Sequence, residues 1–198
     1  AAMCLENNIL FNAGRGSVFT KKGINEMDAC IMDGSNLESG AVAGIRNVKN
    51  PVKLCKEILL HSGHVFLSGK GANDFAIQRG VELAPDDYFF SKFRYDQWVE
   101  VRDSDIYTLD HTEDKFDVAN KEKKFGTIGA VAMDVHGNIA ATTSTGGMTN
   151  KRYGRIGDSP VIGSGTYANN NTCAISCTGH GEYFLRAVVA YDVSCLIE

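Results

Sequence analysis

Two threonines, Thr127 and Thr145, stand at the two ends of a segment whose pattern predicts a β-hairpin. The strand-like block GTIGAVAMD is followed by the turn residues VHGN and by a second block, IAATTST. A turn centred near His136 and Gly137 places Thr127 opposite Thr145. Cross-strand partners have Cβ atoms about 4.5–5.5 Å apart, so one hydroxyl can orient the other. The same pairing also fits an ordinary contact between two strand threonines.

The composition changes upstream of this hairpin, from about residue 99 to residue 126. Asp, Glu, Lys and Thr dominate there with little periodicity, as in DSD and KEKK. This pattern predicts a mobile linker that ends at the step from Gly126 to Thr127, and such a tether favours intramolecular cleavage at that bond. A freed Thr127 carries a hydroxyl nucleophile and an α-amine, whose pKa of about 7.7–8.0 suits it to accept the proton.

Thr178 and Gly179 lie between a short predicted strand and a predicted helix. Their hydroxyl and N–H groups are therefore free of strand partners and near a positive helix end, which predicts an oxyanion hole. A plain helix entry capped by Thr178 explains the same residues equally well.

Arg155 and Asp158 occur together in the segment KRYGRIGDSP. A guanidinium matches a carboxylate and an aspartate matches an ammonium, so the two side chains together could recognise the backbone end of a free α-amino acid. An arginine three residues before an aspartate is also typical of a surface ion pair.

The elements around these residues predict one α/β domain over residues 1–198. The expected elements are a helix end at 1–5, a loop at 11–16, strands at 26–32, 64–67 and 173–177, helices at 50–63, 71–80 and 181–198, and a polar glycine-rich stretch at 146–171. The first helix has no cap before it and the last has no stop signal. We therefore expect the fold to lack N-terminal and C-terminal elements.

Composition excludes several classes of partner. The 198 residues are 43% hydrophobic and 22% charged with a net charge of −4, and no basic stripe predicts contact with nucleic acid. No apolar run suits a membrane span, and the start of the chain has no secretion signal pattern. The six cysteines include no C-x-x-C pair, which predicts free buried thiols in a reducing cytoplasm: Cys4, Cys30, Cys55, Cys173, Cys177 and Cys195.

Several segments together resemble the plant- and bacterial-type L-asparaginase/isoaspartyl peptidase family, closest to its bacterial enzymes. They are LENNILFNAGRGSVFT, EMDACIMDG, GTIGAVAMDVHGNIAATTSTGGMTNKRYGRIGDSP, GSGTYANN and CTGHGE. Members of this family are N-terminal-nucleophile hydrolases of the threonine type, with an α/β/β/α sandwich fold. The resemblance covers nearly the whole chain, and the long segment around Thr127 is highly specific.

The resemblance implies a self-cleaving enzyme that hydrolyses L-asparagine and β-aspartyl dipeptides and releases L-aspartate. The implied parts are residues 1–126 and 127–198, which would form a heterodimer that pairs into a heterotetramer. The implied roles are Thr127 as nucleophile, Thr145 as its hydroxyl partner, Thr178 with Gly179 as oxyanion hole, Arg155, Asp158 and the Gly181 carbonyl as substrate-binding groups, and Asn12 as support.

No cofactor for catalysis is implied, but a structural sodium ion is. Its ligands would be backbone carbonyls, which suit a hard cation: those of Leu5, Glu6, Asn8, Phe11, Ala13 and Arg15. The sequence departs from the family at its ends, because the family's first strand, its His-Gly-Gly-Ala-Gly-like loop and its closing strands are not found.

Three other interpretations stay open. A glycosylasparaginase would use the same nucleophile, arginine and aspartate, but usually acts after secretion. The triplet Gly157-Asp158-Ser159 is also found in GDS-type esterases, with Ser159 as nucleophile and His180 as base, although here it lies deep in the chain. Finally, a truncated homologue could associate with partner subunits without catalysis.

Overall fold

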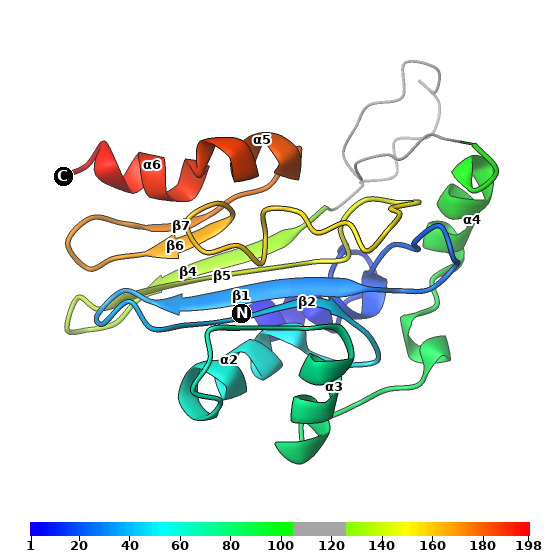
Figure 1. The fold of residues 1–198 in the computed structure, drawn as a ribbon, viewed down its shortest axis with the longest axis horizontal. Coiled ribbons are helices and arrows are strands. Elements are labelled where there is room, and N and C mark those ends of the chain that lie inside the picture. The colour runs from blue at the N-terminus through cyan, green and yellow to red at the C-terminus, as the bar shows by residue number, and fades with distance from the viewer. Residues whose placement is uncertain (105–125) are drawn as a thin grey trace.

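The computed structural model describes residues 1–104 and 126–198 of the chain (Figure 1). Its helices are α1 (Ala2–Glu6), α2 (Pro51–His61), α3 (Gly69–Gln78), α4 (Lys92–Val101), α5 (Gly181–Ala187) and α6 (Val189–Cys195), with short 3-10 turns at Gly14–Gly16 and Asp86–Phe89. Its strands are β1 (Met27–Asp33), β2 (Ser39–Ile45), β3 (Phe66–Ser68), β4 (Ile128–Met133), β5 (Ile139–Thr145), β6 (Thr166–Ala168) and β7 (Ala174–Ser176). The predicted α/β class is confirmed.

Five strands form one mixed sheet in the order β3-β2-β1-β5-β4. Only the pair β2 and β3 is parallel, while β1 pairs with β2 and β5, and β4 with β5, in antiparallel fashion. The hairpin of β4 and β5 pairs Ile128 with Ser144 and Met133 with Ile139. One further step along this register brings Thr127 opposite Thr145, as the turn position predicted.

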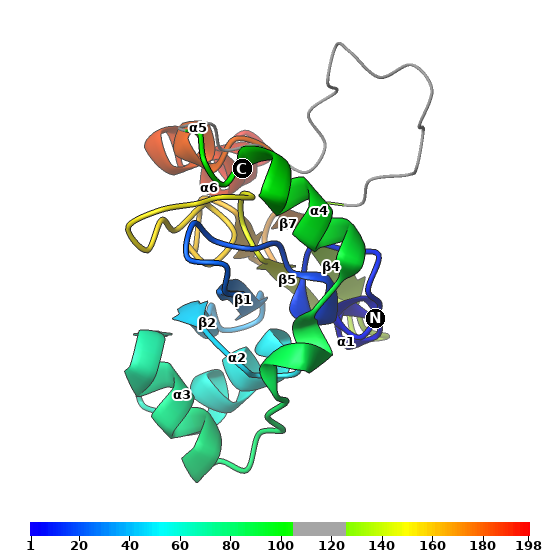
Figure 2. The same cartoon turned by 90° about the vertical axis from the view of Figure 1, so that its right-hand side faces the viewer.

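The sheet separates two apolar layers (Figures 1 and 2). Helices α2 and α3 cover one face, and the small β6–β7 hairpin lies over the other, with α5 and α6 beyond it. On the helix side, Leu54 and Ile58 of α2 pack into the larger core cluster. On the hairpin side, Tyr167 and Ala190 belong to a smaller cluster.

The two-residue period of the strands assigns side chains to these two layers. Met27 and Ala29 of β1 belong to the helix-side core, whereas Met32 belongs to the hairpin-side cluster. The same alternation puts Ile128 in the helix-side core, so that Thr127 and Gly129 face the hairpin side. The nucleophile candidate is thus positioned by the strand pattern itself.

The linker and the C-terminal helix differ from the predictions. Residues 99–101 belong to α4, which begins after Ser91, whose hydroxyl accepts a hydrogen bond from the Arg94 N–H. The predicted linker therefore does not start at residue 99, and its remainder over residues 105–125 lies outside the described residues. The single predicted helix over 181–198 is wrong as well, because Val188 takes a left-handed conformation with φ of 50° and divides it into α5 and α6.

Two strands were not predicted, β2 and β6. The sequence of β2, SGAVAGI, contains two glycines, and β6 is a three-residue strand inside a glycine-rich stretch. Glycine is depleted in strands, so both segments lack a strand signal. Their strand structure comes from pairing with β1 and β7.

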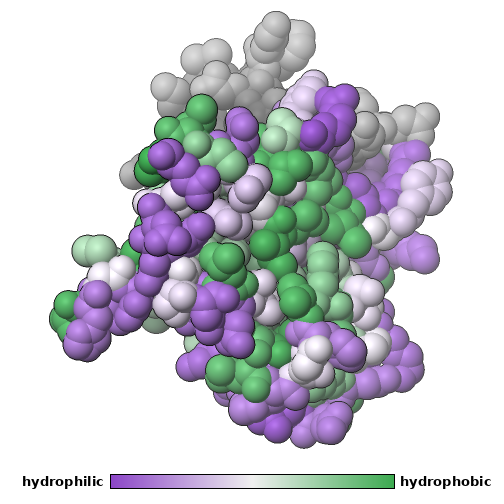
Figure 3. Space-filling model, turned by 60° about the vertical axis from the view of Figure 1, so that its left-hand side comes forward, coloured by the Kyte–Doolittle hydropathy of each residue, from purple (hydrophilic) through white to green (hydrophobic). Residues whose placement is uncertain are grey.

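Polar and apolar side chains share the surface, and Figure 3 shows apolar residues gathered in the middle of one face. Val131, Met133 and Val135, on β4 and in the turn after it, are 56, 73 and 95% exposed. Within the described residues, β4 is an edge strand of its sheet. Across those residues, none of the helices is long and apolar enough to cross a membrane.

The cysteines are only partly buried. All six are free thiols in the structure, and Cys30 and Cys55 are buried as predicted. Burial raises the pKa of the Cys30 thiol to about 12. The prediction was wrong for Cys4 and Cys195, which are exposed because α1 and α6 bury other positions, Ala2 and Glu6 in α1 and Ala190 and Ser194 in α6.

Candidate active site

Thr127 and Thr145 are joined by a hydrogen bond between their hydroxyls. The Thr127 hydroxyl donates to Thr145 Oγ1 at 3.0 Å, and the same oxygen accepts the Gly147 N–H at 3.0 Å. Thr145 is 3% exposed, whereas Thr127 is half-buried. The buried threonine thus fixes the orientation of the accessible one, which is what a nucleophile and its partner require.

Asn12 holds both sides of this hydroxyl pair. Its side chain donates to the Gly147 carbonyl at 2.7 Å, and its backbone carbonyl accepts the Gly146 N–H at 3.0 Å. Its backbone N–H donates to the Gly126 carbonyl at 3.2 Å, which belongs to the peptide bond before Thr127. Asn12 is 1% exposed. A single buried residue therefore anchors the peptide before Thr127 and the turn after Thr145.

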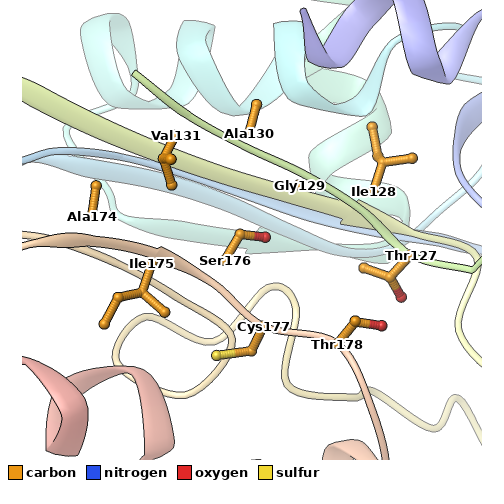
Figure 4. Close-up of a pocket in the computed structure, with 10 residues that line it drawn as sticks. All are labelled: Thr127, Ile128, Gly129, Ala130, Val131, Ala174, Ile175, Ser176, Cys177 and Thr178. Carbon is orange, nitrogen blue, oxygen red and sulfur yellow. The ribbon is translucent and has the colours of Figure 1, made fainter. Parts of the chain in front are cut away.

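Thr127 and Thr178 line one pocket of about 490 Å³ between β4 and β7. Figure 4 shows the two threonines together at one end of this pocket, with the apolar side chains of Val131 and Ile175 at the other. Thr178 is exposed and lies two residues after the end of β7, past the strand end as predicted. Its hydroxyl is accordingly available to a group bound beside Thr127.

Gly179 must be a glycine at this position. Its φ is 155°, and a Cβ atom there would lie 2.7 Å from the ring of Phe184 in α5. The helix that follows has only seven residues, since it ends before Val188. The predicted contribution of a long helix dipole to an oxyanion hole is therefore smaller than the sequence suggested.

Arg155, Asp158 and Gly181 come together at the start of α5. A Cβ atom at Gly181 would lie 2.9 Å from Arg155 Nη2 and 2.9 Å from Asp158 Oδ1. Gly181 therefore packs directly against both charged groups, and a larger residue there would clash with them. The cluster brings a cationic and an anionic group close together, while the role of these residues and of the Gly181 carbonyl in binding stays a prediction.

Asp158 is 5% exposed, and its Oδ2 atom has no hydrogen-bond partner among the described residues. Burial raises the pKa of this carboxyl above its usual value, Arg155 lowers it, and the negative charge of Glu182 raises it further. A buried carboxylate oxygen without a partner is costly. An ammonium group placed beside it would supply the missing donor.

The main partner of Arg155 was not predicted. Its Nε and Nη2 atoms donate to the two carboxylate oxygens of Glu182 at 2.9 and 3.0 Å, so the ion pair is bidentate. This contact holds the pKa of Glu182 below its usual value. Glu182 directly follows Gly181 in the segment CTGHGE, and only this adjacency signalled its role.

Gly147 connects the charged cluster to the hydroxyl pair. Its N–H binds Thr145 Oγ1, and a Cβ atom at this residue would lie 3.6 Å from Arg155 Nη1. A ligand held by Arg155 and Asp158 would thus lie near the hydroxyls of Thr127 and Thr145. Sequence spacing could not show this proximity, because it depends on how the loop after β5 folds back.

The loop of the predicted sodium site is tightly folded around neutral carbonyls. A Cβ atom at Gly14 would lie 2.5 Å from the Glu6 carbonyl oxygen, and one at Gly16 would clash with the Phe11 carbonyl oxygen. The carbonyls of Leu5, Asn8 and Ala13 accept N–H groups within the same loop, and a carbonyl oxygen retains a second lone pair. In residues 1–104 and 126–198, no cluster of three or more His, Cys, Asp and Glu side chains could hold a metal.

The Glu6 side chain, from the start of this loop, contacts β5, the strand that ends at Thr145. It is fully buried and accepts hydrogen bonds from the Ser144 hydroxyl at 2.7 Å and the Val52 N–H at 3.1 Å. Burial raises the pKa of Glu6 to about 7, against the opposing effect of these bonds. The carboxyl ties α1 to α2 and β5, which supports the strand that ends at Thr145.

The esterase interpretation disagrees with the geometry. Ser159 is 3% exposed, and its backbone carbonyl accepts a hydrogen bond from the Thr166 hydroxyl at 3.0 Å. His180 is exposed and stacks edge-on against Tyr183. A buried serine of this kind is a poor candidate for attack on an external substrate.

Comparison with known proteins identifies the relationship. The sequence pattern of the family described as Asparaginase matches residues 1–198, the whole chain. The chain belongs to the asparaginase family. The predicted resemblance is therefore confirmed at the level of the family.

Individual relatives agree with this assignment. The chain is 48% identical over 198 residues to the isoaspartyl peptidase of Escherichia coli strain K12, and this alignment covers all of the chain and 61% of that protein. It is 44% identical over 190 residues to the isoaspartyl peptidase/L-asparaginase of Xenopus laevis, covering 96% of the chain and 58% of that protein. The chain thus spans about 60% of the length of these relatives.

Proposed function

We propose that the protein is a self-cleaving threonine amidohydrolase that acts on L-asparagine and β-aspartyl dipeptides. The observation that carries this proposal is the hydrogen bond between Thr127 and Thr145, in a pocket with Thr178. The names of the relatives favour these substrates over those of a glycosylasparaginase. Since the chain spans about 60% of those proteins, the activity belongs to the whole protein.

Self-cleavage would begin with attack of Thr127 Oγ1 on the Gly126 carbonyl carbon. The carbonyl oxygen gains negative charge in this step, and the Asn12 N–H at 3.2 Å is already directed to it. The C–N bond then breaks, the acyl group moves to the hydroxyl oxygen, and the nitrogen takes up a proton to become the α-amine. Water hydrolyses the resulting ester, which leaves a Gly126 carboxylate and regenerates the Thr127 hydroxyl.

Substrate hydrolysis would use the same hydroxyl and the new α-amine. The amine accepts the hydroxyl proton while Oγ1 attacks the side-chain carbonyl carbon of asparagine or the isopeptide carbonyl of a dipeptide. Ammonia or an amino acid leaves with that proton, and a β-aspartyl ester remains on Thr127. Water then hydrolyses the ester and releases L-aspartate. Thr178 and Gly179 would donate to the oxygen that carries negative charge in both steps.

Recognition of the substrate would rest on its α-carboxylate and α-amine. Arg155 supplies the cation for the carboxylate, while Asp158, with an unpartnered Oδ2 atom, and the Gly181 carbonyl supply acceptors for the ammonium. These groups contact the part that asparagine and β-aspartyl dipeptides share. The cluster therefore favours α-amino acid substrates without selecting between the two leaving groups.

We also propose the assembly that this chemistry implies. Residues 1–126 and 127–198 would stay associated after cleavage as a heterodimer, because β1 from the first part pairs with β5 from the second in one sheet. The heterodimer would pair into a heterotetramer with the α/β/β/α sandwich of N-terminal-nucleophile hydrolases, located in the cytoplasm. A sodium ion would be held by the carbonyls of the loop over residues 5–15.

Two matched substitutions test the proposed function. Thr127→Val keeps the shape of the side chain and removes the hydroxyl, whereas Thr127→Ser keeps the hydroxyl. We expect the Val variant to lose self-cleavage and also the release of L-aspartate from asparagine and β-aspartyl dipeptides. Intact-mass measurement detects the self-cleavage. The Ser variant should retain part of both activities. Undiminished hydrolysis by a folded Val variant would refute the assignment of Thr127.

A further inference from the structure

Glu182 occupies one of the two edges by which the Arg155 guanidinium can bind a carboxylate. Glu182 binds the edge formed by Nε and Nη2, with both oxygens engaged at 2.9 and 3.0 Å. A guanidinium presents a second edge, formed by Nη1 and Nη2, that can also bind a carboxylate bidentately. The Arg155 side chain is 19% exposed and that of Glu182 is 50% exposed. The ion pair is therefore largely shielded on the arginine side.

Two glycines pack beside the Nη1 atom of Arg155. A Cβ atom at Gly157 would lie 2.9 Å from Nη1, and a Cβ atom at Gly147 would lie 3.6 Å from it. Gly147 in turn donates its N–H to Thr145 Oγ1. The edge that Glu182 leaves available is thus next to the backbone that supports the nucleophile.

We infer that Glu182 is a positioning residue, which holds Arg155 by its Nε edge so that the Nη1 edge receives the α-carboxylate of the substrate. This inference rests on the proposed function and deepens it. Without Glu182, the Arg155 side chain would be free to rotate, and binding would have to restrict it at an entropic cost.

The same contact could instead block substrate binding, and that role leads to a different expected result. If Glu182 instead occupied the site of the substrate carboxylate, it would compete with substrate and would have to move away. Removing it would then improve binding. The printed contacts argue against competition, because Glu182 engages only Nε and Nη2, and a second carboxylate could bind Nη1 while the first stays in place.

Glu182 also affects Asp158 through its charge. Its negative charge is one of the causes that raise the pKa of Asp158. Neutralising Glu182 should therefore lower the pKa of Asp158 in the free enzyme and shift the acid limb of kcat/KM to lower pH. A residue with a purely structural role would leave that limb unchanged.

The test compares Glu182→Gln and Glu182→Asp with Glu82→Gln, a surface control whose carboxylate pairs with Lys49. For Glu182→Gln we expect KM for L-asparagine to rise about 10-fold to 100-fold, with a much smaller change in kcat, because substrate binding would have to restrict a mobile Arg155 side chain. Glu182→Asp should recover part of this loss, and the control should match wild type. At a pH above the acid limb, combining Glu182→Gln with Arg155→Ala should add nothing to the KM effect of Arg155→Ala, since both substitutions act on one contact.

The outcomes separate this inference from the proposed function. Active wild-type protein together with an unchanged or lowered KM in Glu182→Gln would overturn the positioning role and leave the proposed function intact. Wild-type protein that neither hydrolyses L-asparagine or β-aspartyl dipeptides nor binds L-aspartate in calorimetry would overturn both. If Glu182→Gln does not fold in thermal melts, the same comparison with Glu182→Asp decides.

Discussion

Thr145→Val removes a hydroxyl that accepts two hydrogen bonds without changing the shape of the side chain. The first bond comes from the Thr127 hydroxyl and the second from the Gly147 N–H, both at 3.0 Å. Thr145 is 3% exposed, so water cannot easily replace its oxygen. The substitution therefore leaves the Gly147 N–H without its acceptor and the Thr127 hydroxyl without its orienting partner.

The expected magnitude follows from these two losses. A buried donor left without a partner costs about 1–3 kcal/mol, whereas the Thr127 hydroxyl is half-buried and can turn to water. For a chain of this length, that loss lowers Tm by roughly 2–10 °C. Thr145→Ser is the matched control, because it keeps the hydroxyl and loses one methyl group, at a cost of about 1 kcal/mol.

The two variants should thus be destabilised to a similar degree but differ in activity. We expect Thr145→Val to slow self-cleavage and L-asparagine hydrolysis at least 10-fold and Thr145→Ser to retain both, as measured by intact mass and ammonia release after thermal melts establish folding. If the Val variant is processed and turns over asparagine at the wild-type rate, the hydrogen bond from Thr127 to Thr145 does not orient the nucleophile.

Three further predictions concern the pH dependence set by Asp158, the packing of two glycines, and the hydroxyl of Thr178. The pKa of Asp158 is raised and its ionised form would bind the substrate ammonium, so the acid limb of the kcat/KM profile should lie above the usual aspartate range. The acid limb of the kcat profile should lie at lower pH, because the bound ammonium favours the ionised carboxylate. Acid limbs at the same pH in both profiles would argue against this role of Asp158. Gly129→Ala should destabilise the protein by about 1–3 kcal/mol in urea unfolding, since its Cβ would clash with Ser176. Gly71→Ala, a helical site with nothing nearby, should stabilise it by about 0.5–1 kcal/mol; equal effects would contradict the packing argument. Thr178→Val should lower kcat about 10²–10³-fold with little change in KM, and a raised KM at constant kcat would make Thr178 a binding residue instead.

The sequence predicts the hairpin that joins Thr127 to Thr145 well because its determinants are local. The turn at His136 and Gly137 and the alternating pattern of the two strands set the register, and this register brings Thr127 to Thr145. The Arg155 and Asp158 cluster was predicted from charge complementarity within one short segment. Both predictions depend on residues close together in the chain.

The parts that the sequence did not predict depend on contacts across the fold or on backbone geometry without a local signal. The pair of Arg155 with Glu182 joins two segments through the turn of the chain into α5. The break at Val188 requires a left-handed conformation in a β-branched residue, which has no glycine or proline to announce it. Helix α4 did carry one signal, the cap at Ser91, but only its last residues, 99–101, fell within a predicted element, the linker.

The most direct test of Thr127 as the nucleophile is the mass and N-terminal sequence of the chains in purified protein kept at neutral pH. The account predicts two associated chains, the second beginning Thr-Ile-Gly-Ala-Val, in wild-type protein and a single chain in Thr127→Val. Wild-type protein that stays folded but uncut, or a second chain that begins at any residue other than Thr127, would contradict it.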